Sequence, residues 1–227
     1  MRRLIFPLLL GLAGAAVLVS LGVWQLQRLA WKEGVLAAIE ARIADAPGPL
    51  PATPDPVRDQ YLPVAATVTF TGESLDVLVS RKQIGAGFRP VAVAVTEDGR
   101  RILIDRGFLR EGERAAPRPG PEAGAATITG HLLWPDEVDG FTPDPDLTRG
   151  IWFARDLPRM ASHLGTEPML VVANAPAPPG FAAEPMPVDI SGIPNDHLGY
   201  AIQWFGLAAV WLGMTALLLW RIRRRTV

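Results

Sequence analysis

Two long uncharged segments constrain this chain more than any other feature of its sequence. Residues 4–27 and 198–220 contain no Asp, Glu, Lys or Arg. Each segment exceeds the roughly 20 residues that an apolar helix needs to cross the hydrocarbon core of a bilayer. We therefore predict two transmembrane helices, and all residues between them then lie on one side of the lipid bilayer. A cleaved signal peptide is the alternative for the first segment, because it has a basic start and small residues near Gly14.

Basic residues at the two chain ends predict the orientation in the membrane. Cytoplasmic flanks of membrane helices carry an excess of Lys and Arg, so residues 1–3 and the basic tail 221–227 are expected in the cytoplasm of a bacterium. The middle domain then faces the periplasm, and in a eukaryote the equivalent location is the mitochondrial inner membrane. All 23 acidic residues lie between the two spans, which argues against a nucleic acid as partner. The flanking basic residues are Arg2, Arg3, Arg221, Arg223, Arg224 and Arg225.

The region between the spans reads as a helical extension followed by a β-rich domain. An apolar stripe continues the first helix outward over residues 28–46, and a proline-rich stretch then ends it. Residues 47–197 form the extracytoplasmic domain. The fold class we predict is an integral membrane α+β protein, in which two transmembrane helices flank a mainly antiparallel, small barrel-like β domain with one short helix at 156–164. The expected strands are 64–71, 77–81, 89–96, 101–108, 127–134 and 168–173.

Small residues in the two spans suggest how the helices pack. Glycine and alanine let membrane helices approach closely, so we expect contacts at Gly11 and Ala15 on the first span. On the second span we expect them at Gly206, Ala209 and Gly213.

Residues suited to catalysis are scarce. The chain has no cysteine, which excludes covalent c-type haem, cysteine-based copper carriage and thiol exchange. It has no HExxH motif, no glycine-rich phosphate loop and no nucleophile spaced with a base. We therefore expect a protein that is not an enzyme, with His131 and His163 in structural roles.

His197 is the candidate functional residue, because it stands at the mouth of the second span. One reading is an interfacial histidine that hydrogen-bonds the outer domain. The other is an axial haem ligand, since neutral imidazole is a common iron ligand and Trp204, two turns deeper, would pack on the porphyrin. On this reading Ala201 and Ala208 leave space for the flat macrocycle.

Arg28 and Lys32 leave the first span on its outer side, where the positive-inside rule does not favour them. They are either anchors at the lipid interface, together with the neighbouring tryptophans, or partners of an anionic ligand group such as the haem propionates.

Four sequence blocks in a fixed order resemble the surfeit locus protein 1 family, the cytochrome c oxidase assembly factors. The resemblance covers nearly the whole chain. It departs from the family pattern at Asp196 and Gln203, and at Phe108, which stands where a tryptophan is usual. The blocks are LGVWQLQRLAWK (21–32), RRILIDRGFLR (100–110), IWFARDLPRMA (151–161) and PNDHLGYAIQWFG (194–206).

The resemblance implies a chaperone for respiratory chain biogenesis, which binds haem a non-covalently and transiently and aids its insertion into the haem-bearing oxidase subunit. Its expected partners are that subunit, haem A synthase and the lipid bilayer. The family's haem-linked histidine and tryptophan match His197 and Trp204. A cofactor-free membrane scaffold that stabilises the nascent oxidase subunit remains the alternative, and a sensor with an outer ligand domain is a third.

Overall fold

The computed structural model describes residues 2–115 and 117–224, without the side chains of Arg2 and Arg3. The chain divides into two compact units, a helix pair formed by Met1–Ala38 and Ile190–Val227, and a β-rich domain formed by Ile39–Asp189. Part of the orientation argument rests on the side chains of Arg2 and Arg3 and on Arg225, which lie outside the described residues. Helix α1 covers Arg2–Ile43 and helix α3 covers His197–Arg224.

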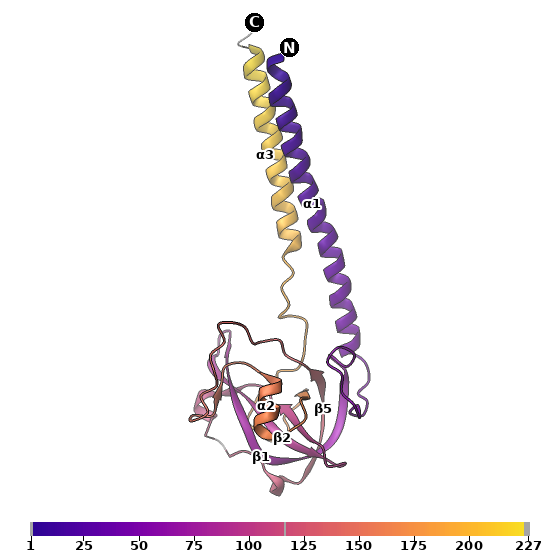
Figure 1. The fold of residues 1–227 in the computed structure, drawn as a ribbon, viewed down its shortest axis with the longest axis vertical. Coiled ribbons are helices and arrows are strands. Elements are labelled where there is room, and N and C mark those ends of the chain that lie inside the picture. Colours follow the sequence, from indigo (N-terminus) through magenta and orange to yellow (C-terminus); the bar gives the residue numbers. More distant parts are fainter. Residues whose placement is uncertain (1, 116, 225–227) are drawn as a thin grey trace. The chain divides into compact units, whose positions relative to one another are not determined.

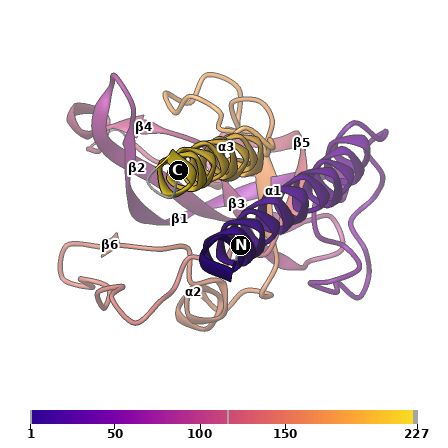
Figure 2. The ribbon, with the colours of Figure 1, turned by 90° about the horizontal axis from the view of Figure 1, so that it is seen from above.

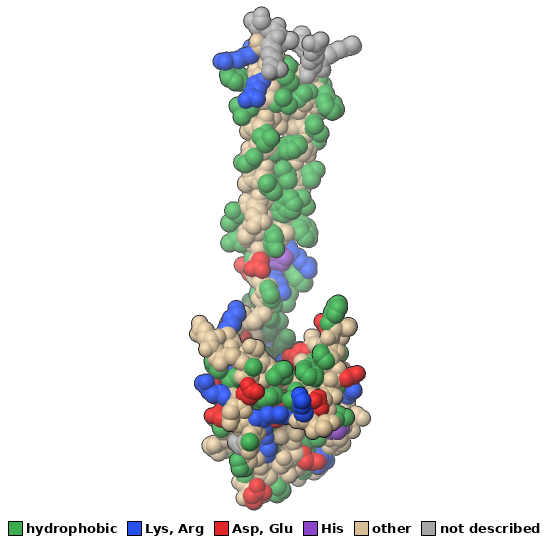
Figure 3. Space-filling model, turned by 90° about the vertical axis from the view of Figure 1, so that its left-hand side faces the viewer, with side chains coloured by type: hydrophobic (Ala, Val, Ile, Leu, Met, Phe, Trp, Pro, Cys, Tyr) green, Lys and Arg blue, Asp and Glu red, His purple; other side chains and the backbone are tan. Residues whose placement is uncertain are grey.

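Both helices are long and apolar enough to cross a membrane, as the two uncharged segments predict. They lie side by side (Figures 1 and 2), and hydrophobic side chains cover the visible face of the pair (Figure 3). The indole Nε1 of Trp211 donates a hydrogen bond to the carbonyl oxygen of Gly11, 2.9 Å away. This contact joins the first apolar helix to the second.

Three glycines of α1 admit large side chains of α3. A Cβ atom added to Gly11, Gly14 or Gly22 would lie within 2.6 Å of Thr215, Trp211 or Phe205, respectively. Small residues on α1 therefore serve packing, and Gly11 and Ala15 are buried as predicted.

The predicted packing face of α3 is wrong. Gly206, Ala209 and Gly213 are exposed, and α3 instead buries Ala201 and Ala208. The reason is that α3 inserts bulky residues into the glycine gaps of α1, so close backbone approach needs small residues on only one helix.

The domain contains seven strands and one short α-helix. The strands form one sheet in the order β4-β2-β3-β7-β5-β1-β6, and β1 also pairs with β2. The pairings therefore close a circuit through β1, β2, β3, β7 and β5, which agrees with the barrel-like prediction. Two pairings are parallel, β1 with β6 and β3 with β7, and the others are antiparallel. The strands are β1 (Pro63–Arg81), β2 (Gly85–Thr96), β3 (Arg101–Asp105), β4 (Leu109–Arg110), β5 (Ala125–Leu133), β6 (Ile151–Trp152) and β7 (Leu170–Ala173).

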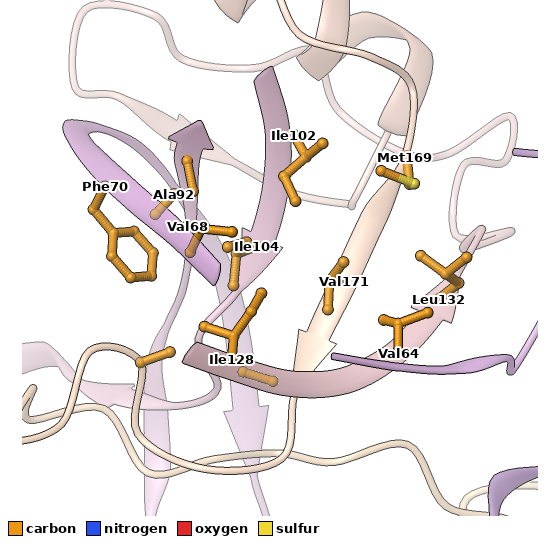
Figure 4. Close-up of a cluster of buried hydrophobic side chains, with 13 residues drawn as sticks. Val64, Val68, Phe70, Ala92, Ile102, Ile104, Ile128, Leu132, Met169 and Val171 are labelled. Carbon is orange, nitrogen blue, oxygen red and sulfur yellow. The ribbon is translucent and has the colours of Figure 1, made fainter. Parts of the chain in front are cut away.

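Alternating residues of the central strands build two hydrophobic clusters. Ile102, Ile104 and Val171 point into the interior of the circuit (Figure 4). Leu103, between Ile102 and Ile104, and Val172, next to Val171, belong to a second cluster. That cluster includes residues of helix α2 (Leu157–Leu164). Strands β3 and β7 are thus buried on both faces, which explains their continuous apolar sequences.

The predicted short helix is confirmed as α2, and local residue preferences explain its two ends and one hairpin turn. The Asp156 side chain accepts a hydrogen bond from the Arg159 amide at the start of α2, and Gly165 follows the helix in the left-handed conformation. Gly99 lies in the turn between β2 and β3 and has φ of 84°.

The strands differ from the prediction in several places: β2 begins earlier, at Gly85, the short strands β4 and β6 were not predicted, and two further differences have a clear physical reason. The expected strands 64–71 and 77–81 are one strand, β1, with an irregularity in its pairing to β2 between Phe70 and Ser74. The predicted strand 101–108 ends at Asp105. Gly107 has φ of 93°, which turns the chain out of the extended conformation.

Candidate functional site

His197 is the first residue of α3, as predicted from the polar residues before it. The Tyr200 amide donates to the carbonyl oxygen of Asp196, 3.2 Å away, and so begins the helix. The side-chain oxygen of Asn195 is buried without a hydrogen-bond partner among the described residues, so Asn195 does not cap the helix. The imidazole therefore stands where the chain enters the apolar helix, at the end of the helix pair that lies away from both termini.

Gln25 of α1 holds the imidazole in place. Its side-chain oxygen Oε1 lies 2.8 Å from Nδ1 of His197, and Gln25 is only 9% exposed. Because an amide oxygen accepts but does not donate, Nδ1 carries the proton in the neutral ring. The other nitrogen, Nε2, then keeps its lone pair and is the atom able to bind a metal.

This pairing has the form that proteins use to orient a metal-binding histidine. Such a histidine donates its second ring N–H to an oxygen acceptor, which sets the tautomer and the direction of the ring. Gln25 escaped the sequence prediction, although it carried a signal: it is a polar residue inside an uncharged membrane segment, where polar groups are costly and functional.

Trp204 is half-buried, and the alanines around it are covered. Ala201 and Ala208 are 1% and 4% exposed, because they lie on the face of α3 that packs against α1. The space predicted over these alanines for a flat macrocycle is therefore filled by the contact between the two helices. The nitrogen donor fits iron, whereas this face does not fit a porphyrin. A ring bound at His197 has to lie outside the contact between the helices.

Arg28 and Lys32 follow Gln25 on α1, by one helical turn and by about two turns respectively. They therefore lie toward the end of the helix pair away from the chain termini, like His197 (Figure 1). The guanidinium carbon of Arg28 lies 3.9 Å from the ring centroid of Trp31, which is 53% exposed. This cation–π contact suits an interfacial anchor. Lys32 is half-buried and forms no salt bridge within the described residues.

The other two histidines belong to the domain. His131 is 5% exposed, and its two ring nitrogens lie 3.1 Å from the Asn174 side-chain oxygen and 3.0 Å from the Ile43 carbonyl oxygen. The ring of His163 lies 6.1 Å from that of Trp152. Both histidines thus have structural contacts. Residues 2–115 and 117–224 contain no group of three or more His, Asp or Glu side chains that could hold a metal ion.

Comparison with known proteins matches residues 12–209 to the SURF1 family, a range that contains Gln25, Arg28, Lys32, His197 and Trp204. Surfeit locus protein 1 of Rattus norvegicus is 28% identical over 211 residues, which cover 84% of this chain and 68% of the relative. A SURF1-like protein of Monosiga brevicollis is 29% identical over 208 residues, which cover 83% of this chain and 78% of the relative. The cytochrome oxidase assembly protein SHY1 of Saccharomyces cerevisiae is 36% identical over 117 residues, which cover 48% of this chain and 30% of the relative.

Proposed function

Because this chain belongs to the SURF1 family, we propose that it is a membrane-bound assembly factor for haem-copper cytochrome c oxidase, and that it carries haem a through His197. The name of the yeast relative, a cytochrome oxidase assembly protein, supports the first half of the proposal. The hydrogen bond between Gln25 and His197 carries the second half, because it leaves Nε2 of a neutral imidazole available to the haem iron.

The proposed cycle treats haem as cargo rather than as a resident cofactor. His197 receives haem a at the outer membrane interface after haem A synthase has made it, and releases it to the haem-bearing subunit of the oxidase. Gln25 keeps Nδ1 protonated throughout. Trp204 offers the exposed part of its ring to the macrocycle, and Arg28 and Lys32 attract the propionates from the outer side. None of these steps breaks a covalent bond in the cargo, so the role is that of a chaperone.

The orientation in the membrane is part of the proposal. With both termini in the cytoplasm, the domain stands in the periplasm of a bacterial inner membrane, or in the intermembrane space of a mitochondrion. His197 then lies at the outer surface, where both haem-handling partners would present their sites.

The covered alanine face favours a second function, a cofactor-free scaffold. The helix pair buries Ala201 and Ala208 and leaves no preformed flat pocket there. In this alternative the helices and the domain stabilise the nascent oxidase subunit, and the hydrogen bond from His197 to Gln25 only joins the two spans.

Haem content of the purified full-length chain distinguishes the two functions. We would co-express it with the haem A pathway and record reduced-minus-oxidised spectra of wild type, His197→Ala and His163→Ala. The proposal expects haem in wild type and in the His163 control, and loss of haem in His197→Ala. A wild-type protein without haem, or equal haem after His197→Ala, would overturn the ligand role and leave the scaffold.

A further inference from the structure

Arg106 is a buried cation without an anionic partner among the described residues. It follows β3 and is 1% exposed. Its Nε donates to the carbonyl oxygen of Ala177. The neighbouring carboxylate, Asp105, is already shared by Arg89 at 2.7 Å and Arg155 at 3.0 Å. A buried charge is costly unless it is paired, so the environment of Arg106 is incomplete.

The faces of the Arg106 guanidinium contact aromatic rings. Its Cζ atom lies 3.2 Å from the ring centroid of Phe181 and 5.1 Å from that of Phe70. Aromatic contacts satisfy the faces of a guanidinium but not its N–H groups, which point outward in the plane. One of these nitrogens, Nη2, is buried and has no hydrogen-bond partner in the described structure.

Arg118 adds a second unpaired nitrogen near the same aromatic ring. Its Cζ lies 5.8 Å from the ring centroid of the same Phe181, and its Nη1 is also buried without a partner among the described residues. Burial, and second the charge of Arg118, lower the pKa of the Arg106 guanidinium to about 9. Two like charges therefore lie near one aromatic ring, and each guanidinium retains an unused donor.

The acidic side chain that pairs with Arg118 is also bound by another arginine. The two carboxylate oxygens of Asp76 accept hydrogen bonds from Nε of Arg114 at 3.0 Å and from Nη2 of Arg118 at 2.9 Å. This pairing positions Arg118 while its Nη1 remains unpaired. Two arginines thus share one carboxylate, and Arg106 adds a third positive charge, which leaves positive charge in excess.

A fixed turn covers Arg106. The Phe181 amide donates to the Pro178 carbonyl oxygen at 3.2 Å, and Gly180 has φ of 83°, as in a type II turn. Beyond the turn, Phe108 and Glu184 exchange two backbone hydrogen bonds of 2.7 Å. The segment that carries Phe181 is therefore anchored to the residues next to Arg106, and the aromatic contact is built into the fold.

We propose that Arg106 and Arg118 form a binding site for one small oxyanion, a phosphate or a carboxylate, which their unpaired Nη atoms hold beneath Phe181. Guanidinium groups bind both anions through in-plane N–H groups. The anion supplies the missing negative charge and the missing acceptors. The site lies wholly within the β-rich domain and is independent of haem binding at His197.

Anion-dependent stability of the full-length chain in mild detergent tests this site. We would measure the melting temperature of the domain in sodium phosphate, in sodium acetate and in sodium chloride of equal ionic strength. We expect a saturable rise with phosphate or acetate beyond that in chloride, and the more effective anion identifies the preferred class. A response equal to that in chloride would overturn the proposal.

Two variants and a control locate the effect. Arg118→Gln is expected to weaken the anion response tenfold or more, because it removes one of the two guanidinium groups but leaves Arg114 on Asp76. Arg106→Gln is expected to abolish the response. If Arg106→Gln does not fold, Arg118→Gln alone tests the site. Arg110→Gln is the control, because the Arg110 side chain is 56% exposed and already has an acidic partner, Glu184, at 3.6 Å. An undiminished response in Arg118→Gln would place the anion elsewhere.

Discussion

Replacing Gly107 by alanine is expected to destabilise the domain by more than the backbone strain of a positive φ alone, because the new side chain also collides with backbone atoms. Gly107 has φ of 93°, a conformation that costs a residue with a side chain about 1–2 kcal/mol. A Cβ atom at this position would lie 2.0 Å from the carbonyl oxygen of Glu184 and 2.7 Å from Cα of Pro185. Both contacts are with backbone, so no side-chain rotation relieves them.

The expected magnitude follows from what has to move. The shift of residues 184–185 would break the two backbone hydrogen bonds between Phe108 and Glu184, each 2.7 Å long. A hydrogen bond contributes about 1 kcal/mol net. Together with the strain at Gly107, we expect a loss of about 3–4 kcal/mol in the free energy of unfolding.

Gly99→Ala is the matched control. Gly99 also has a positive φ, 84°, but a Cβ atom there meets nothing within 4 Å. The control therefore carries the strain of about 1–2 kcal/mol without the collision. We would compare urea unfolding of both variants in the full-length chain, followed by near-ultraviolet circular dichroism. Equal losses of stability in the two variants would refute the argument that Glu184 closes on Gly107. Faster hydrogen exchange at the Phe108 and Glu184 amides in Gly107→Ala alone would support it.

Three further predictions concern the site and the charged groups. Gln25→Leu is expected to lower haem affinity about 10- to 100-fold by releasing the imidazole, measured as haem per protein; unchanged affinity would remove Gln25 from the site. Arg28→Gln with Lys32→Gln is expected to reduce haem occupancy if both meet propionates, and undiminished occupancy would make them anchors only. Burial raises the pKa of Glu137, but the hydrogen bonds and charge of its arginine partner outweigh burial and hold the pKa below 4.5. This stabilisation is therefore complete above pH 4.5 and is lost as the pH falls through the lowered value. Wild type should accordingly be more stable than Glu137→Gln at pH 7, and the gap should close in acid; a gap that is constant with pH would contradict this.

The domain shows how far local patterns reach. The capping residue Asp156 and the left-handed Gly165 mark the ends of α2, and the Asp98-Gly99 pair marks the hairpin. These signals depend on neighbouring residues, so they are visible in the sequence. The continuity of β1 was not visible, because its glycine and serine look like a turn. Pairing with β2 on both sides of the irregularity holds the strand together.

The site was predicted in part for the same reason. His197 could be recognised because a polar residue at the mouth of an apolar helix is conspicuous in any sequence. Gln25 carried only the signal of a polar residue in an uncharged segment, and Arg106 carried none. Their importance comes from what lies around them, an imidazole at 2.8 Å for Gln25 and an absent carboxylate for Arg106.

By itself, the sequence determined the two apolar helices, the β-rich domain between them and the histidine at the start of the second span. The length, charge and hydrophobic period of a segment are properties of continuous sequence, so they can be read without any knowledge of the fold. Tertiary structure decided which helix faces meet, how the sheet pairings close on themselves, and which oxygen accepts from Nδ1 of His197. That oxygen belongs to Gln25, 172 residues away in the sequence, and only the packing of one helix against the other brings the two together.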